Sequence, residues 1–213
     1  MEFVWDGIRK AFDLWISGDS EIIEITLRTI VISLVATLLS LCVGVPIGAV
    51  LALKSFPGRR PVVALFLWRS GPLGALDLIY TPSAMVGAQF LIATPLVIGF
   101  SMASIQQINP KLLDQIVALG ASRGQFLWLL IREARLGLLA ALMAGFGAVI
   151  SEVGAAMIVG GNIAGETRVL TTATVLETGR GNFEVAIALG VVLLVMAYAV
   201  NLVFTGVQQR RPT

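Results

Sequence analysis

The chain has few charged residues, no histidine and a single cysteine. Charged residues make up 13% of its 213 residues, against roughly 25% in soluble domains. The absence of histidine excludes Ser-His triads, histidine acid–base catalysis and histidine metal sites. Because Cys42 is the only cysteine, no disulfide can form within the chain. With 57% hydrophobic residues, this composition excludes a disordered chain, a nucleic-acid-binding protein and an ordinary soluble enzyme, and it indicates a protein embedded in lipid.

Long uncharged stretches predict membrane-spanning helices. A helix needs about 20 residues to cross the ~30 Å of hydrocarbon in a bilayer. Four stretches are long enough, with Glu152 the one charge inside them: 29–53, 78–110, 136–165 and 185–209. A soluble protein with four such stretches would have too little polar surface to cover them. We therefore expect an all-α, polytopic transmembrane helix bundle over residues 21–209.

Residues 1–20 are expected to form a separate amphipathic helix. Glu2 and Asp6 lie near its start, and no basic region precedes an apolar run, which argues against a signal peptide. Its apolar residues are Phe3, Trp5, Ile8, Phe12, Trp15 and Ile16. The pattern fits a helix that lies at the membrane surface, and it fits equally well a short helix packed on the bundle.

The distribution of basic residues predicts the orientation, because short cytoplasmic loops are enriched in Lys and Arg. One set of loops has only Asp114 and Glu133 beside its basic residues, which are Lys54, Arg59, Arg60, Lys111, Arg123, Arg132, Arg135, Arg210 and Arg211. The remaining basic residues lie among most of the acidic residues of the chain. The first set is expected in the cytoplasm. The chain then starts outside and ends inside, which requires an odd number of crossings.

Four long stretches give an even number, so a fifth crossing is needed between Arg60 and Asp77. The residues there are too few for a regular span and are interrupted by Arg69 and Pro72. Either the chain crosses irregularly here, or the natural chain has additional residues within 57–69. We favour the second interpretation, with about five spans in total.

The basic side carries a structured loop over 106–125. Asn109-Pro110 is an N-cap followed by proline at the first helical position, which predicts a short helix over 110–119 that ends at Gly120. Its apolar stripe consists of Leu112, Leu113, Ile116 and Leu119. A capping box over 122–125 then opens a further helix that runs on as FLWLLIREARLGLL. A plain connector would be two to eight polar residues, so this loop is expected to dock into a partner.

The stretch DQIVALGASRGQFLWLLIREAR resembles the EAA loop of the membrane permease subunits of ABC importers. Gly120 holds the glycine of that signature and Leu130 its isoleucine position. Asp-Gln-Ile at 114–116 stands in place of Glu-Ala-Ala, and Arg-Glu at 132–133 replaces the final Leu-Pro. The stretches GVPIGAVLAL, WRSGPLG, SEVGAAMIVGGNIAGETRVLTTA and ETGRGNFEVAIALGVVLL are similar to the subgroup that imports tungstate or molybdate. The resemblance covers about residues 20–206.

This resemblance implies a permease subunit in the cytoplasmic membrane of a prokaryote. As a homodimer it would form the translocation pathway for an oxyanion, tungstate first and molybdate next. An extracytoplasmic binding protein would deliver the anion, and two ATPase subunits would bind at the cytoplasmic side. The short helix would be the coupling helix that seats on the ATPase, through Asp114, Val117, Ala118, Gly120, Ala121, Ser122 and Arg123.

ATP and Mg²⁺ would be bound by the partner ATPase, because this chain has no G-x-x-x-x-G-K-[ST] motif. We therefore expect neither an enzymatic activity nor a cofactor in this chain. A secondary transporter or channel without an ATPase is the alternative, although such a protein has no need of the structured loop.

Small residues recur every four positions in the span that follows the loop. One stripe holds Gly137, Ala141 and Gly145, and a second holds Ala140, Ala144 and Ala148; small residues let membrane helices approach closely. Glu152 continues the second stripe and is expected to face protein. Although an intramembrane carboxylate is a functional candidate, we expect a structural role, with the carboxylate bonded to backbone, hydroxyls or an arginine.

Residues 159–183 form the most irregular polar segment. Irregular backbone at membrane depth is tolerated where it is buried in protein or lines a water-filled cavity, and hydroxyls and arginine suit an oxyanion. The candidates for the translocation pathway are Thr171, Thr172, Arg168 and Arg69, with Arg28 as a lesser one. A solvated outer loop that contacts the binding protein is an equally good interpretation.

Overall fold

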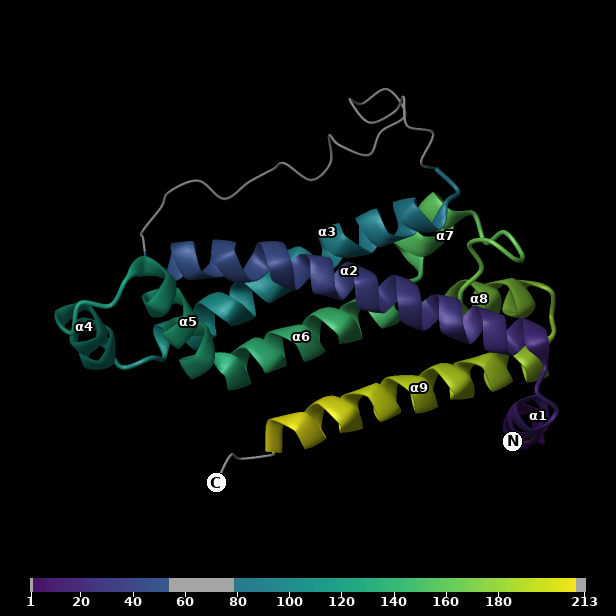
Figure 1. The fold of residues 1–213 in the computed structure, drawn as a ribbon. Coiled ribbons are helices and arrows are strands. Elements are labelled where there is room, and N and C mark those ends of the chain that lie inside the picture. The colour runs from purple at the N-terminus through teal and green to yellow at the C-terminus, as the bar shows by residue number, and fades with distance from the viewer. Residues whose placement is uncertain (1, 54–78, 210–213) are drawn as a thin grey trace.

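A computed structural model describes residues 2–53 and 79–209, and the regular structure in these ranges is entirely helical. The helices are α1 (Glu2–Ile16), α2 (Ser20–Leu53), α3 (Pro82–Gln106), α4 (Pro110–Ala118), α5 (Arg123–Glu133), α6 (Arg135–Ile150), α7 (Gly154–Gly160), α8 (Leu170–Gly179) and α9 (Phe183–Gln209). The long helices lie side by side, with α4 and α5 at one end of the bundle and α1, α7 and α8 at the other (Figure 1). We refer to these as the α4 end and the α1 end. The predicted all-α bundle is confirmed.

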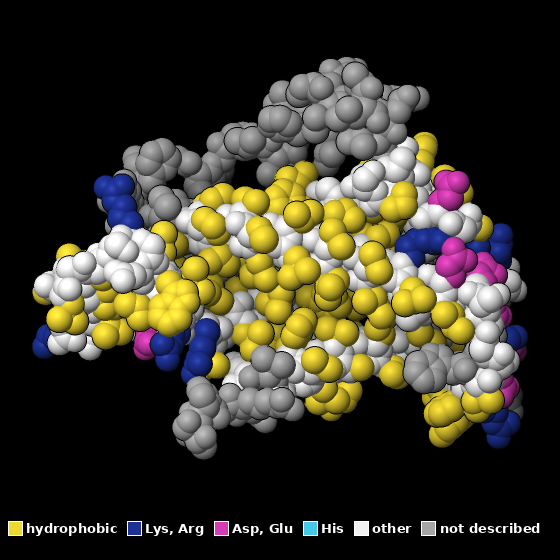
Figure 2. Space-filling view, in the orientation of Figure 1, with side chains coloured by type: hydrophobic (Ala, Val, Ile, Leu, Met, Phe, Trp, Pro, Cys, Tyr) yellow, Lys and Arg dark blue, Asp and Glu magenta, His cyan; other side chains and the backbone are white. Residues whose placement is uncertain are grey.

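Within residues 2–53 and 79–209, three helices are long and apolar enough to cross a membrane, namely α2, α3 and α9. A fourth span results if α5 and α6, which meet at 67°, are counted as one. The predicted fifth crossing, the proposed additional residues within 57–69 and the candidate Arg69 all lie outside the described residues. Hydrophobic side chains cover the middle of the bundle and charged ones gather at its two ends (Figure 2). Which end faces the cytoplasm remains a prediction.

Helices α2 and α3 run in the same direction. Ile32, in the first half of α2, shares a buried cluster with Met85 near the start of α3, and Ala49 shares another with Ile105 near the ends of both helices. The end of α2 and the start of α3 therefore lie at opposite ends of the bundle. The residues that join them lie outside the described ones, and the odd number of crossings remains a prediction.

Small residues bring α2, α3 and α6 together, as the stripes predict. A Cβ atom added to Gly44 of α2 would lie 2.8 Å from the Cγ1 of Val97 in α3. A Cβ atom added to Gly145 of α6 would lie 2.9 Å from the Cγ2 of the same valine. Val97 is fully buried between them. One stripe of α6 therefore faces α3, and close packing holds these three helices together.

The sequence predicts one continuous helix after the structured loop, but the structure has two. The break is at Ala134, where α5 ends and α6 begins. Arg132, Glu133 and Arg135 flank the break, and charge is costly in hydrocarbon. The apolar α6 therefore starts where the charges end, while Leu130 and Ala134 pack into a buried cluster at the α4 end.

The N-terminal helix is present and packs on the bundle, which was one of the two predicted arrangements. Its small residues Gly7 and Ala11 are buried, with Gly7 close to Ile187 of α9, and Lys10 lies 3.5 Å from Glu184. The helix is seen end-on in Figure 1 and so lies across the bundle axis. Its larger apolar residues Trp5, Phe12 and Ile16 are exposed. Its place at the membrane surface remains a prediction.

Candidate functional site

The short helix of the loop, α4, extends past the end of α2 and carries no buried residue (Figure 1). The side-chain oxygen of Asn109 accepts a hydrogen bond from the backbone N–H of Lys111, 3.0 Å away, and Pro110 occupies the first helical position. Gly120 follows the helix with φ of +76°, a left-handed conformation that favours glycine. The sequence predicted both ends of this helix.

One face of α4 is attached to the bundle and its C-terminal end is not. Leu112 and Leu113 pack against the buried cluster at the α4 end, which consists of Ala49, Ile105, Ile108, Leu130 and Ala134. Val117 and Leu119, by contrast, are 63% and 87% exposed. The predicted apolar stripe is thus divided: Leu112 and Leu113 pack on the bundle, whereas Leu119, the C-cap of the helix, faces outward. Docking of the stripe into a partner remains a prediction.

The turn after α4 is fixed by a complete capping box. The backbone N–H of Ser122 donates to the side chain of Gln125 at 2.8 Å, and the Gln125 N–H donates to the Ser122 hydroxyl at 3.4 Å. The predicted coupling residues are exposed except for the half-buried Ala121. These residues form a short, rigid and accessible surface on α4 and its turn. Their contact with an ATPase remains a prediction.

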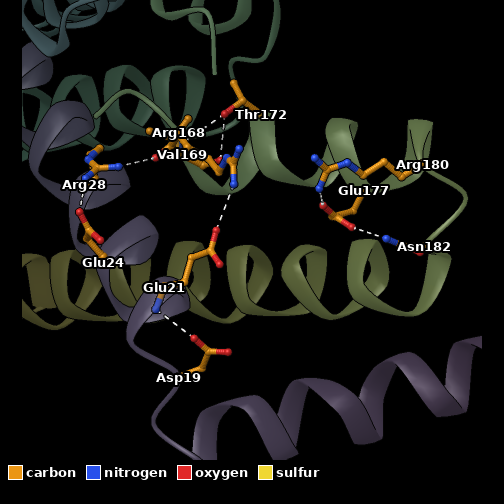
Figure 3. A network of polar contacts seen from close by, with 10 residues as sticks. All are labelled: Asp19, Glu21, Glu24, Arg28, Arg168, Val169, Thr172, Glu177, Arg180 and Asn182. Atoms are coloured by element: carbon orange, nitrogen blue, oxygen red, sulfur yellow. Dashed lines mark hydrogen bonds and ion pairs between the residues drawn. The ribbon is translucent and has the colours of Figure 1, made fainter. Parts of the chain in front are cut away.

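At the α1 end, two arginines fasten the loop between α7 and α8 to the start of α2 (Figure 3). The Arg168 guanidinium lies 3.0 Å from the Glu21 carboxylate. Arg28 forms an ion pair with Glu24 and donates to the backbone carbonyls of Arg168, at 3.3 Å, and Gly165, at 2.7 Å. Sequence reasoning selected both arginines as anion ligands but did not predict their carboxylate partners. Glu24 lies four residues from Arg28 on the same helix, whereas Glu21 lies 147 residues from Arg168 in the chain.

These contacts leave the arginine charges neutralised. The side chains of Arg28 and Arg168 are only 14% and 16% exposed, and each guanidinium faces a carboxylate. The Nε of Arg168 is buried and has no hydrogen-bond partner among the residues that the structure describes. In this conformation the arginines hold the loop in place, and an anion would have to displace Glu21 or Glu24 to bind them.

The two threonines predicted for the pathway are buried. The Thr171 hydroxyl donates to the backbone carbonyl of Glu152 at 3.2 Å. The Thr172 hydroxyl accepts from the backbone N–H of Val169 and donates to its carbonyl, each at 3.0 Å, which caps α8. Because both hydroxyls are engaged with backbone, this geometry disfavours a role as anion ligands and favours a role in shaping the start of α8.

Two further threonines organise the same region. The Thr167 hydroxyl, fully buried, donates to the carbonyl of Gly160 and accepts from the N–H of Ile163. The hydroxyl of Thr29 in α2 accepts from the backbone N–H of Leu170, 3.0 Å away. Sequence reasoning did not single out Thr29, because inside a long apolar stretch it looks like any other spanning residue.

Glu152 lies in the break between α6 and α7, not in a continuous helix. The sequence predicted that Glu152 continues the second small-residue stripe. It does not, because α6 ends at Ile150. Its half-buried carboxylate accepts a hydrogen bond from the backbone N–H of Ala155 at 3.0 Å and so caps the first turn of α7. The contact is with backbone, one of the partners that the sequence suggested. Its structural role remains a prediction.

A second carboxylate network closes the turn between α8 and α9 (Figure 3). Glu177 accepts hydrogen bonds from Asn182 and from Arg180, each at 2.7 Å. The Asn182 hydrogen bond and, to a smaller extent, the Arg180 charge lower the pKa of Glu177 below its ordinary value of 4.5. The ionised form of this carboxylate is therefore favoured in the turn.

The fold and the loop first define a class: a helical, multi-pass membrane protein with a rigid, capped helix exposed at the end of its spans. No protein-family model matches the chain. Curated relatives do. The chain is 35% identical to the tungstate uptake system permease protein TupB of Peptoclostridium acidaminophilum, over 98% of this chain and 100% of the relative. The chain therefore belongs to the family of ABC transporter permeases.

Two further relatives support this assignment. A probable anion ABC transporter permease protein of Haloferax volcanii is 36% identical over 90% of this chain and 92% of the relative. The TupB protein of Campylobacter jejuni is 32% identical over 95% of this chain and 92% of the relative. The alignment with the Peptoclostridium protein extends over 227 residues, so that relative has residues without a counterpart among the 213 of this chain.

Proposed function

We propose that the chain is the membrane subunit of an ATP-driven oxyanion importer, with tungstate as the first candidate substrate and molybdate as the second. Two relatives named as tungstate uptake permeases and one named as an anion ABC transporter permease support this substrate class. In this proposal two copies of the chain form the pathway, and a separate extracytoplasmic protein delivers the anion. Selection among anions then falls mainly to that protein.

The observation that carries the proposal is the form of α4. It is capped at both ends, attached to the bundle by Leu112 and Leu113, and exposes Val117 and Leu119. Exposed apolar residues on a rigid helix outside the spans suit insertion into a groove of a partner protein. We assign that groove to an ATPase that binds ATP and Mg²⁺, because the present chain has no nucleotide-binding motif.

The packing under α4 suggests how a movement of the ATPase would reach the spans. The cluster that receives Leu112 and Leu113 contains Ala49 from α2, Ile105 from α3 and Leu130 from α5. A displacement of α4 is therefore transmitted to the ends of several helices at once. Close-packed helices respond as rigid bodies, so the bundle would switch between inward-open and outward-open arrangements.

The α1 end is assigned to the outside. Exposed carboxylates there, including Glu21 and Glu24, are paired with Arg168 and Arg28 and shield their charge. Arg28 and Arg168 therefore offer no open site to a bare anion. This favours delivery by a binding protein in direct contact with the permease.

The test is transport by a reconstituted system. The chain is co-expressed with the ATPase and binding protein encoded beside it, purified, and placed in liposomes with ATP inside or outside. We expect co-purification of all three and tungstate uptake that needs both ATP and the binding protein. Uptake by the permease alone, driven by an ion gradient, would instead establish a secondary transporter. Calorimetric titration of the binding protein with tungstate, molybdate and sulfate identifies the anion.

A further inference from the structure

An apolar cavity of about 200 Å³ lies between α1 and α9. The described side chains that line it are all apolar: Ala11 and Phe12 of α1, and Val191, Val192 and Val195 of α9. Phe12 and Val195 are 65% and 54% exposed, so the cavity is a groove that is open along one side. Water can form no hydrogen bonds with such a lining, whereas an apolar occupant is stabilised by burying its surface there.

The depth of the groove matches the acyl region of a bilayer. Helix α9 provides a candidate span over Phe183–Gly206. Val191 and Val195 follow its first residue by a distance along the helix of about 12 and 18 Å, at 1.5 Å per residue. With the start of the span at the interface, both valines lie at acyl-chain depth. The open side of the groove then faces lipid.

The charged residues next to Phe12 on α1 fit a lipid headgroup. Arg9 lies three residues before Phe12, so the two side chains are neighbours on one face of α1. Arg9 is exposed and forms no ion pair within the part of the chain that the structure describes. Asp6 and Asp13, one turn on either side of it, are exposed as well. A cation between two anions complements a headgroup with one phosphate and one ammonium group.

We propose that one zwitterionic phospholipid binds beneath α1, with an acyl chain in the groove and its phosphate on Arg9. The ammonium group of an ethanolamine headgroup then lies beside Asp6 or Asp13. The lipid completes the contact between α1 and α9, which the protein itself makes mainly through the small residues Gly7 and Ala11. This site does not depend on the transport activity proposed above.

The test uses native mass spectrometry of the full chain in detergent, titrated with phosphatidylethanolamine. Val195→Phe fills the groove from its exposed side, and Val203→Phe is the matched control. Val203 is 64% exposed on the same helix but does not line the groove. We expect one tightly retained lipid per chain, with retention about tenfold weaker in Val195→Phe, the effect of about two methylenes no longer buried. The control should retain the lipid like the unmodified chain.

A second variant tests the headgroup contact and does not touch the packing. Arg9→Gln should weaken retention of phosphatidylethanolamine about fivefold to tenfold, because a charge-assisted hydrogen bond is lost. Asp13→Asn should shift the preference toward phosphatidylglycerol. Equal retention by the unmodified chain, Val195→Phe and Arg9→Gln would overturn the proposal. So would an equal loss in Val195→Phe and Val203→Phe, since it would show lipid bound non-specifically around the spans.

Discussion

The contact of Val97 with two glycines gives the sharpest prediction for the fold. Gly44→Ala adds a methyl group 2.8 Å from the Cγ1 of Val97, closer than two carbon atoms can lie without displacement. Because Val97 is fully buried, it has no open space into which it can turn. Overpacking of this kind costs about 1–3 kcal/mol, and alanine in place of a helical glycine returns about 1 kcal/mol.

The matched control is Gly99→Ala in α3, where an added Cβ has no neighbour within 4 Å. Gly99→Ala should be neutral or stabilising by about 1 kcal/mol. Gly44→Ala should be less stable than this control by about 1–3 kcal/mol. The assay is thermal unfolding of the purified protein in detergent, followed by loss of monodisperse protein in size-exclusion chromatography.

The double variant Gly44→Ala, Val97→Ala tests the contact itself. It transfers volume from one helix to the other, so its loss of stability should be smaller than the sum of the two single losses. We expect an interaction energy of about 1–2 kcal/mol. Additive losses within about 0.5 kcal/mol would refute the packing described for α2 and α3.

Three further predictions concern the ends of the bundle. Leu119→Asp should leave the stability against unfolding unchanged, because the side chain is 87% exposed. It should weaken ATPase binding, measured by surface plasmon resonance, about 10- to 100-fold, which corresponds to the burial of one leucine. Equal binding would contradict the assignment of α4 to the ATPase contact. Glu152→Gln should keep transport largely intact, since an amide oxygen can still accept from Ala155; near-total loss with normal assembly would refute a structural role. Because the pKa of Glu177 is lowered in the folded state, its ionised carboxylate stabilises the fold at pH above the ordinary pKa of 4.5, and this stability is lost as the pH falls through the lowered pKa. Asn182→Ala should flatten the acidic part of the profile of melting temperature against pH. An unchanged profile would contradict the role of this hydrogen bond.

Local signals explain why the α4 region could be predicted. The cap at Asn109, the proline after it and the left-handed Gly120 are all features of a few adjacent residues, and each was found in its expected role. The break at Ala134 was missed because helix propensity is high on both sides of it. The break is set by where the charged residues lie relative to the membrane spans, which local helix propensity does not report.

The α1 end was less predictable because its contacts are distant in sequence. Glu21 pairs with Arg168, and Thr29 binds the N–H of Leu170, across 147 and 141 residues. From the sequence alone, a polar, glycine-rich segment suggests anion ligands and a solvated outer loop that contacts the binding protein equally well. The structure shows that the hydroxyls of Thr171 and Thr172 are bonded to backbone, and both interpretations remain predictions.

We propose that α4 is the part of the chain that contacts the ATPase. A photo-crosslinking residue at Leu119, with a second variant at Ile163 in the exposed loop of the α1 end, tests it most directly in the assembled complex. We expect a crosslink to the ATPase from position 119 and none from position 163. An ATPase crosslink from position 163, or none from position 119 in an intact complex, would contradict it.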